Sequence, residues 1–331
     1  MSREFIAITL GDPSGVGPEI ILKSLAEDDS IYKVCKPILV GDLGVVTKAI
    51  KDFNIDVKVN TIEHSSNGFY TYKTVDLIDL GNIDMDAFEY GKISAQCGKA
   101  AWDYIEKCVD LYKNEGIKAI ATSPINKEAL KAGNIPFIGH TEMFGHLTDI
   151  DDPLTMFEVD SLRVFFLSRH LSLRDSIDMV KKDRLIDYIT RTIEELKKLG
   201  VKGSLYVSGL NPHNGEHGLF GTEEMDEIEP AVKHCQNLGM DVIGPIPADS
   251  VFYKGFSDKC GAVLSLYHDQ GHIATKTYDF HRTISLTLGM PVLRTSVDHG
   301  TAFDIAGMNI ADPVSMKESI LLAAKYSGYT L

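Results

Sequence analysis

The chain has 331 residues and a formal net charge of −14, from 33 Lys and Arg against 47 Asp and Glu. This length predicts about two domains of ~150 residues each, and the 44% hydrophobic content is typical of a fully folded globular protein. The acidic balance argues against nucleic acid and anionic membrane as partners, because both need a basic surface. A site for an anionic substrate therefore needs local lysine, arginine or metal charge.

The five cysteines are odd in number and widely scattered, without a CxxC pair, which is typical of a reducing cytoplasm. No apolar run approaches the length of about 18 residues that a membrane span requires. The N-terminal apolar run, residues 6–10, is too short for the core of a signal peptide. We therefore expect a cytoplasmic protein.

Short β-branched runs alternate with longer amphipathic stretches along the chain, beginning with a strand, a Gly/Pro turn and a helix pattern from Pro18. Many of the strand candidates are nearly uniformly apolar, as strands covered on both faces are. This alternation predicts an α/β architecture with two lobes. Strand candidates are residues 5–10, 37–41, 75–80, 118–123, 163–168, 204–209, 262–267 and 283–289, and helix candidates are residues 91–114, 174–199, 223–238 and 313–326.

Polar residues gather at the ends of the predicted strands, where open α/β sheets place their ligand sites. The segment GDPSGVGPE, residues 11–19, follows the first strand, and Pro18 is suited to the first helical turn. This helix start would direct backbone N–H groups and the helix dipole at an anion. The segment is neither GxGxxG nor a P-loop, so the alternative is a tight strand-to-helix turn that needs glycine.

Two further helix starts carry groups suited to an oxyanion. Ser123, Asn126 and Lys127 follow a predicted strand, and His140 and Thr141 open a helix in GHTEMF. Hydroxyls, a lysine and an imidazole at helix N-termini favour a negatively charged ligand. For each segment alone, the alternative is a simple helix cap.

Three of the eleven histidines, His170, His213 and His268, each follow a predicted strand. Imidazole is the commonest ligand for borderline cations, and three such ligands leave coordination positions open for substrate or water. We therefore expect a metal site, although a structural role is the alternative for any one histidine. The pairs His213/His217 and His268/His272 have the spacing of a helical zinc pair, but glycine in both segments favours loops.

Carboxylates and cations accompany these histidines. Asp249 and Asp269 could orient the ligating imidazoles or complete the metal sphere. Lys276 and Arg294 supply the positive charge that an anionic substrate needs, since arginine offers a bidentate fork and lysine a point charge. Lys276, Asp249 and Asp269 remain open as candidates for the general base.

Eight segments in one order resemble motifs of the 4-hydroxythreonine-4-phosphate dehydrogenase family, also called the PdxA family, from about residue 6 to residue 325. The resemblance implies a two-lobed fold like that of isocitrate and isopropylmalate dehydrogenases, with the active-site cleft between the lobes. We expect one lobe from residues 1–125 plus 305–331, and a second lobe, with most metal and substrate residues, from residues 126–304. The segments are GDPSGVGPE, ATSPINK, GHTE, SRHLSLRD, GLNPHNGEHGLFGTEE, PIPADSVF, YHDQGH and RTSVDHGTAFDIAG.

The resemblance also implies a homodimer with shared active sites, NAD or NADP as cofactor, and one divalent metal ion per site, zinc, magnesium or cobalt. The dimer partner would contribute to each metal site. At Ser285 this chain departs from the family pattern, which has an asparagine there. Carried over by motif, the metal ligands are His170, His213 and His268, and the substrate contacts are His140, Thr141, Lys276 and Arg294.

Residues 271–282 also depart from the biosynthetic type and resemble a branch acting on D-threonate or D-erythronate 4-phosphate. The implied reaction is oxidation of a 3-hydroxy acid to a β-keto acid that loses CO2, giving dihydroxyacetone phosphate and NADH. One alternative is the oxidation of 4-phosphohydroxy-L-threonine in pyridoxal phosphate (vitamin B6) biosynthesis. More distant alternatives are a metal-dependent hydrolase or aldolase, and a non-catalytic phospho-acid binding protein.

Overall fold

The computed structural model describes residues 3–329, and these divide into two compact units. The described residues up to Pro153 and from Ile284 onward form the first unit, and Leu154–Thr283 forms the second. Residues 126–153 and 284–304, expected in the second lobe, therefore belong to the first unit. The reason is packing, because the helices of residues 127–148 contact the helix Ala95–Glu115, and the strand Leu293–Ser296 pairs with the strand Ala119–Thr122.

The first unit is built on strands in the order β3-β4-β2-β1-β5-β12-β11. The strand pairs from β3 to β12 are parallel, and β11 joins β12 antiparallel. Its strands are β1 (Glu4–Thr9), β2 (Cys35–Gly41), β3 (Lys58–Thr61), β4 (Thr74–Asp79), β5 (Ala119–Thr122), β11 (Ile284–Leu288) and β12 (Leu293–Ser296). Its α-helices are α1 (Gly17–Glu27), α2 (Ser30–Val34), α3 (Leu43–Asp52), α4 (Ala95–Glu115), α5 (Lys127–Ala132), α6 (His140–Thr148) and α12 (Val314–Lys325), with a short 3-10 turn at Ser65–Asn67.

The second unit has the strand order β6-β7-β10-β8-β9, in which only the β6–β7 pair is antiparallel among its described pairings. Its strands are β6 (Leu154–Val159), β7 (Leu162–Phe166), β8 (Ser204–Ser208), β9 (Val242–Ile246) and β10 (Cys260–Ser265). Its α-helices are α7 (Leu173–Asp178), α8 (Lys182–Lys198), α9 (Glu229–Asn237), α10 (Ala248–Gly255) and α11 (His268–Tyr278), with a 3-10 turn at Pro212–Glu216 and a π-helical turn at Glu224–Ile228.

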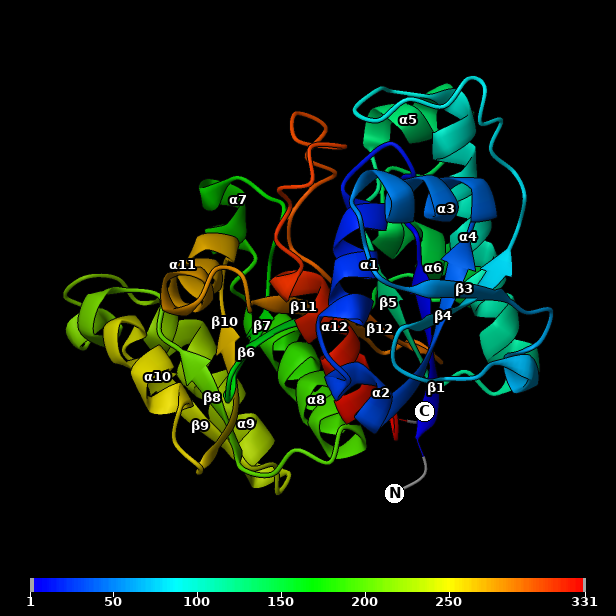
Figure 1. Cartoon of the computed structure of the whole chain (residues 1–331). Coiled ribbons are helices and arrows are strands. Elements are labelled where there is room, and N and C mark those ends of the chain that lie inside the picture. The colour runs from blue at the N-terminus through cyan, green and yellow to red at the C-terminus, as the bar shows by residue number, and fades with distance from the viewer. Residues whose placement is uncertain (1–2, 330–331) are drawn as a thin grey trace. The chain divides into compact units, whose positions relative to one another are not determined.

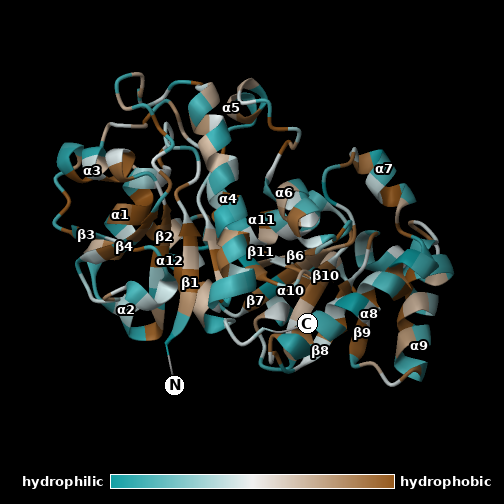
Figure 2. Cartoon of the chain, turned by 90° about the vertical axis from the view of Figure 1, so that its right-hand side faces the viewer, coloured by the Kyte–Doolittle hydropathy of each residue, from teal (hydrophilic) through white to brown (hydrophobic). Residues whose placement is uncertain are grey.

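Helices cover both faces of the strands in each unit (Figure 1). In the first unit α4 packs on one face of β1, and α1 and α12 lie on the other. In the second unit α8 and α9 lie on one face, and α10 and α11 lie on the other. Figure 2 shows the consequence in hydropathy: central strands such as β1 and β10 are hydrophobic, whereas outer helix faces are hydrophilic. This layering confirms the α/β class and explains why the strand candidates are apolar throughout.

The structure adds strands that the apolar runs did not predict, and it corrects two helices. The predicted helix at 174–199 is two helices, α7 and α8, because residues 179–181 break it. The segment that begins at His268 is helix α11, although Gly271 led us to expect a loop. The expected loop around His213 is confirmed, since non-helical backbone angles interrupt its short turn. The strands without a sequence prediction are β3, β6, β9 and β12.

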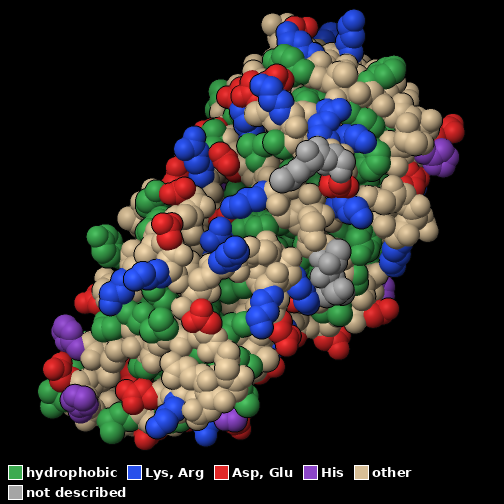
Figure 3. Space-filling view, turned by 90° about the horizontal axis from the view of Figure 1, so that it is seen from below, with side chains coloured by type: hydrophobic (Ala, Val, Ile, Leu, Met, Phe, Trp, Pro, Cys, Tyr) green, Lys and Arg blue, Asp and Glu red, His purple; other side chains and the backbone are tan. Residues whose placement is uncertain are grey.

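The surface carries both signs of charge. Figure 3 shows lysine and arginine side chains interspersed with aspartate and glutamate on one face. All five cysteines are buried and free. Among residues 3–329, no helix is long and apolar enough to cross a membrane.

Candidate functional site

The second unit has a cavity of about 240 Å³ at the carboxyl ends of two adjacent parallel strands, β7 and β10. His170 follows β7 and His268 opens α11 directly after β10, so the sheet brings both imidazoles to one edge. Their ring centroids lie 6.1 Å apart. The cavity is lined by Arg169, His170, Leu171, Leu173, Ser176, Tyr267, His268 and Asp269.

Asp269 orients the His268 ring. Its Oδ1 lies 2.6 Å from His268 Nδ1, and a carboxylate on one ring nitrogen directs the other nitrogen to a ligand. His170 and His268 thus fit the donor set of a borderline divalent cation. Residues 3–329 of one chain contain no group of three or more His, Cys, Asp or Glu side chains placed to hold a metal ion. His213, exposed on the turn after β8, is absent from the cavity lining, and the three-histidine site remains a prediction.

Helix α11 places His268, His272 and Lys276 four residues apart on one face. The His272 ring is buried against Phe157 and Phe166, at centroid distances of 4.3 and 4.7 Å, and lies 4.2 Å from the His268 ring. Burial, followed by the charges of His268 and Lys276, lowers the pKa of His272 to about 3. His272 is therefore a neutral imidazole that packs against the candidate ligand.

Asp249 lies apart from this arrangement. Its exposed side chain is in the first turn of α10, and it does not line the cavity. Asp269 and Lys276 are the general-base candidates on the same helix as His268.

The first unit holds the other set of predicted residues around the buried Arg294. The Arg294 Nε and Nη1 groups donate to the Thr122 and Thr287 hydroxyls, both at 3.0 Å. Because these partners are neutral, they do not balance the guanidinium charge, and burial lowers the pKa of Arg294 to about 9. The Phe144 ring is a further contact, with its centroid 5.7 Å from the guanidinium carbon. A desolvated cation of this kind is suited to binding an anion.

Ser285 belongs to the same surface. The register pairs Thr287 with Arg294 and Ser285 with Ser296 across β11 and β12, so their side chains share one face of the sheet. The sequence predicted Arg294 and Ser285, but not the hydroxyls of Thr122 and Thr287. Their role depends on strand register, which no motif in the sequence specifies.

His140 begins α6 beside this arginine, and its buried Nε2 makes no hydrogen bond among the described residues. Burial and then the Arg294 charge hold the pKa of His140 well below its usual range, so the imidazole is neutral. Two more buried polar atoms, Ser123 Oγ and Asp12 Oδ2, also make no hydrogen bond in the described chain. Thr141 follows His140 in the first turn of α6. These unpaired groups could bind the polar groups of a substrate or cofactor.

The glycine-rich segment at residues 11–19 is a tight turn into α1. Gly11 has φ +74° and approaches so closely that a Cβ would lie 2.5 Å from the Pro124 carbonyl oxygen. The first turn of α1 already holds the carboxylate of Glu19, whose Oε1 accepts from Ala311 N at 2.8 Å and from Lys23 Nζ at 2.6 Å. This carboxylate opposes anion binding there. Asn126 is likewise a helix cap, accepting from two backbone N–H groups of α5.

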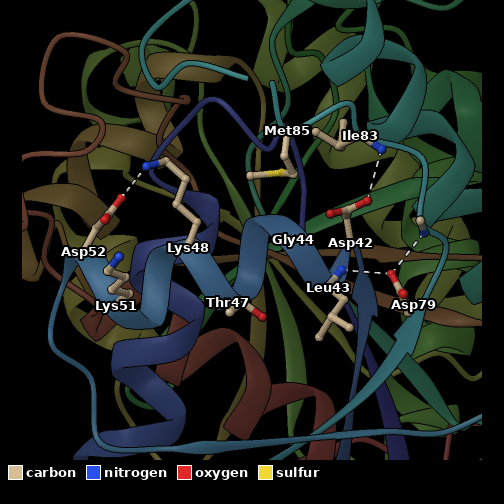
Figure 4. A pocket seen from close by; sticks show the side chains of 11 residues that line it. Asp42, Leu43, Gly44, Thr47, Lys48, Lys51, Asp52, Asp79, Ile83 and Met85 are labelled. Carbon is tan, nitrogen blue, oxygen red and sulfur yellow. Dashed lines mark hydrogen bonds and ion pairs between the residues drawn. The ribbon is translucent and has the colours of Figure 1, made fainter. Parts of the chain in front are cut away.

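A separate open pocket of about 670 Å³ lies beside α3 in the first unit (Figure 4). Its carboxylates have structural roles: Asp42 accepts from Val45 N and Ile83 N, both at 3.0 Å, and Asp79 accepts from Leu43 N at 2.8 Å. Lys48 and Asp52 pair at 2.9 Å. The pocket contains none of the residues that the sequence predicts for the site.

Comparisons with known proteins agree over almost the whole chain. The chain is 56% identical over 325 residues to a protein of Fusobacterium nucleatum provisionally named D-threonate 4-phosphate dehydrogenase, covering 98% of each chain. A relative of the same provisional name from Symbiobacterium thermophilum is 52% identical over 98% of this chain and 97% of its own.

Solved structures give the same result. A 4-hydroxythreonine-4-phosphate dehydrogenase from Burkholderia phymatum is 40% identical, with a TM-score of 0.88 and coverage of 98% of this chain and 99% of its own. The corresponding enzyme of Klebsiella pneumoniae is 36% identical, with a TM-score of 0.91 and coverage of 98% and 100%. Residues 33–323 match the family described as pyridoxal phosphate biosynthetic protein PdxA. The chain therefore belongs to the PdxA family and is an oxidoreductase of the dehydrogenase class.

Proposed function

We propose that this chain is an NAD(P)- and divalent-metal-dependent dehydrogenase that oxidatively decarboxylates D-threonate 4-phosphate or D-erythronate 4-phosphate. The products would be dihydroxyacetone phosphate, CO2 and the reduced nicotinamide cofactor. The observation that carries this proposal is the 56% identity, over 98% of both chains, to a relative provisionally named D-threonate 4-phosphate dehydrogenase. The cytoplasmic location stays a prediction from the sequence.

Each candidate site contributes a distinct chemical function. In the first unit, the uncompensated guanidinium of Arg294 and the neutral imidazole of His140 would bind the anionic groups of the substrate. In the second unit, His170 and His268 would hold the metal together with His213. A bound divalent cation lowers the pKa of a coordinated hydroxyl and stabilises developing negative charge. Lys276, on the same helix face as His268, or Asp269 would take the hydroxyl proton, and the nicotinamide would take the hydride.

The preference for an aldonate over the phosphorylated amino acid is based on Ser285. A serine in place of the family's asparagine shortens the side chain and removes an amide donor from the polar face that it shares with Arg294. A 2-hydroxyl on the substrate in place of a 2-ammonium also changes the substrate's charge by one unit. A desolvated pocket that does not match this charge binds the substrate at a large cost in free energy. Oxidation of 4-phosphohydroxy-L-threonine is the second candidate, because the two solved structures described above are named 4-hydroxythreonine-4-phosphate dehydrogenase.

We also propose a homodimer in which the partner subunit completes each metal site. Two of the predicted ligands share a cavity within one chain and the third does not. Large apolar side chains lie exposed beside both histidine loops: Leu173 is 60% exposed close to His170, and Leu219 is 71% exposed close to His213. Exposed apolar groups of this size favour an interface.

The direct test is turnover of D-threonate 4-phosphate with NAD and a divalent metal. We expect NADH and CO2 to appear in equal amounts and to stop when the metal is removed by a chelator. Products without NADH would favour the metal-dependent hydrolase or aldolase. Binding without turnover would favour the phospho-acid binding protein, and either outcome contradicts the proposal.

Substitution of a ligand tests the metal assignment. His213→Ala should reduce metal content and turnover together, because one of three ligands is lost. His217→Ala is the matched control, since it removes an exposed imidazole from the same turn, also at positive φ. Normal metal content and turnover in His213→Ala would show that the assignment is wrong.

A further inference from the structure

The turn that carries His213 has an unusual backbone. Residues 213–218 all have positive φ, including 53° at His213 and 58° at Asn214. Residues other than glycine avoid this left-handed region because their Cβ atom crowds the following carbonyl oxygen. A run of such residues persists only where surrounding contacts impose it, and strain of this kind clusters at functional sites.

The buried carboxylate of Glu224 supplies one of these contacts. Its Oε1 accepts from the backbone N–H groups of Leu210 and Asn211, both at 2.7 Å, and its Oε2 accepts from Asn211 Nδ2 at 2.8 Å. Glu224 is 0% exposed and begins the π-helical turn before α9. A short π-helical segment is a frequent feature of functional sites. The three bonds fix the chain at the point where it leaves β8 for the His213 turn.

The amide of Gln270 makes a second connection, from α11 to the same turn. Gln270 Oε1 accepts from Leu266 N at 2.7 Å, and its Nε2 donates to the Gly209 carbonyl at 2.9 Å. Leu266 precedes the His268 helix, whereas Gly209 precedes the His213 turn. The hydroxyl of Ser168, two residues before His170, donates to the Leu266 carbonyl at 2.9 Å. A continuous set of buried hydrogen bonds thus joins the three loops that carry the histidines.

We propose that Gln270 and Glu224 are positioning residues, which fix the His213 turn relative to the His268 helix and so preorganise each imidazole for the divalent cation of the metal site that it joins in the dimer. This inference rests on the proposed function, because it assumes that both histidines bind metal. Both side chains are buried and form hydrogen bonds to backbone groups of separate segments. Their substitution removes the hydrogen bonds that hold the loops in place, but it leaves every metal ligand present. Partners that orient metal ligands typically contribute roughly 10–100-fold to metal affinity.

The test is a calorimetric titration of the metal-free enzyme with Co²⁺, paired with hydrogen exchange of residues 209–220 in the absence of metal. Gln270→Met removes both amide bonds at nearly constant volume, and Glu224→Gln replaces an acceptor facing Asn211 with a donor. We expect roughly 10–100-fold weaker Co²⁺ binding in each variant, and exchange in 209–220 faster by about tenfold or more.

Matched controls make the same chemical changes elsewhere in the second unit. Gln236→Met removes an amide bond to the Val242 carbonyl of 2.9 Å, and Glu229→Gln neutralises an exposed carboxylate on α9. Both should bind Co²⁺ within about twofold of the wild type. If one test variant does not fold, as judged by circular dichroism, the other decides.

Wild-type affinity in the folded test variants would overturn the proposal, as would unchanged exchange in 209–220. If the wild type itself binds no Co²⁺, the metal dependence of the proposed function fails, and so does the assignment of these residues to metal binding. The exchange measurement then shows separately whether the hydrogen bonds fix the turn.

Discussion

At the scale of single residues, both candidate sites hold ionisable side chains that are buried against hydroxyl groups or aromatic rings. Arg294 bonds to two hydroxyls, and His272 packs between phenylalanine rings. Asp12 is 0% exposed, and burial raises its pKa to about 7, partly offset by a hydrogen bond from Ser14 N. Burial of such groups costs stability. Replacing one of them should therefore keep or raise the free energy of unfolding, even where activity falls.

Arg294→Met should greatly reduce activity without loss of stability. We expect kcat/KM to fall at least about 100-fold, because charge-assisted hydrogen bonds contribute about 1.5–3 kcal/mol each. The free energy of unfolding should stay constant or rise, since removing a desolvated charge offsets the loss of two neutral-partner hydrogen bonds. Arg191→Met, at a more exposed arginine that pairs with Asp187, is the control for kcat/KM. Steady-state kinetics measures kcat/KM, and urea unfolding measures the free energy of unfolding. Retained activity in Arg294→Met would contradict this account.

Asp12→Asn should stabilise the protein at alkaline pH. The pKa of Asp12 in the folded protein, about 7, lies above the ordinary aspartate value of 3.8, so between these values the native state holds a proton that the unfolded state releases. Wild-type stability from this group therefore falls as the pH rises towards 7. At pH 8 the variant should be more stable by a few kcal/mol, because a pKa difference of one between the two states corresponds to about 1.4 kcal/mol. This advantage should shrink towards pH 5.

Urea unfolding of wild type and Asp12→Asn between pH 5 and 8 measures this effect. Asp258→Asn makes the same chemical change at an exposed carboxylate in the turn after α10 and is the control. A constant difference for Asp12→Asn across this range would show that the carboxyl group titrates normally.

At the scale of elements, the sequence predicts strands well where apolar residues are continuous, as in β1 and β10. It misses β12 because Arg294 interrupts a short run, and β9 because Gly244 and Pro245 resemble a turn. The histidines could be predicted because each follows a recognisable strand. The hydroxyl partners of Arg294 could not, because the register of β11 and β12 arises from tertiary pairing.

Helix α11 contains the most informative correction, at Gly271. Glycine inside the segment suggested a loop, but here it permits close packing: a Cβ would lie 2.5 Å from Phe166 Cε1 and 2.7 Å from Ser265 Oγ. Gly271→Ala should therefore destabilise the protein by about 1–3 kcal/mol, outweighing the helical gain of about 1 kcal/mol from alanine.

Chemical denaturation measures this prediction. The control is Gly328→Ala, where a Cβ meets no atom within 4 Å, and where the change should stay within about 0.5 kcal/mol. Equal or greater stability of Gly271→Ala would mean that α11 does not pack as closely as described. A displaced α11 should also weaken metal binding, since the helix carries His268.

At the scale of the whole molecule, the proposed homodimer accounts for a metal site that the described residues of one chain do not complete. Histidines on different loops allow a complementation experiment. His170→Ala and His213→Ala should each be inactive alone, because each lacks one ligand. If the ligands of one site come from different subunits, mixed dimers contain some intact sites, and co-expression should restore about a quarter to a half of wild-type activity.

The matched control mixes wild type with each inactive variant, which should give activity in proportion to the intact sites. Inactive mixtures in demonstrated mixed dimers would place His170 and His213 of each site on the same subunit. Full activity in a demonstrated monomer would contradict the shared site altogether.

The central claim is that this PdxA-family enzyme oxidises a phosphorylated aldonate. The most direct measurement is kcat/KM for D-threonate 4-phosphate, D-erythronate 4-phosphate and 4-phosphohydroxy-L-threonine under identical metal and NAD conditions. We predict a value for one of the aldonates at least about tenfold above that of the amino acid, the discrimination expected from one mismatched polar group. A clear preference for 4-phosphohydroxy-L-threonine would contradict the account and identify the chain as an enzyme of the vitamin B6 biosynthetic type.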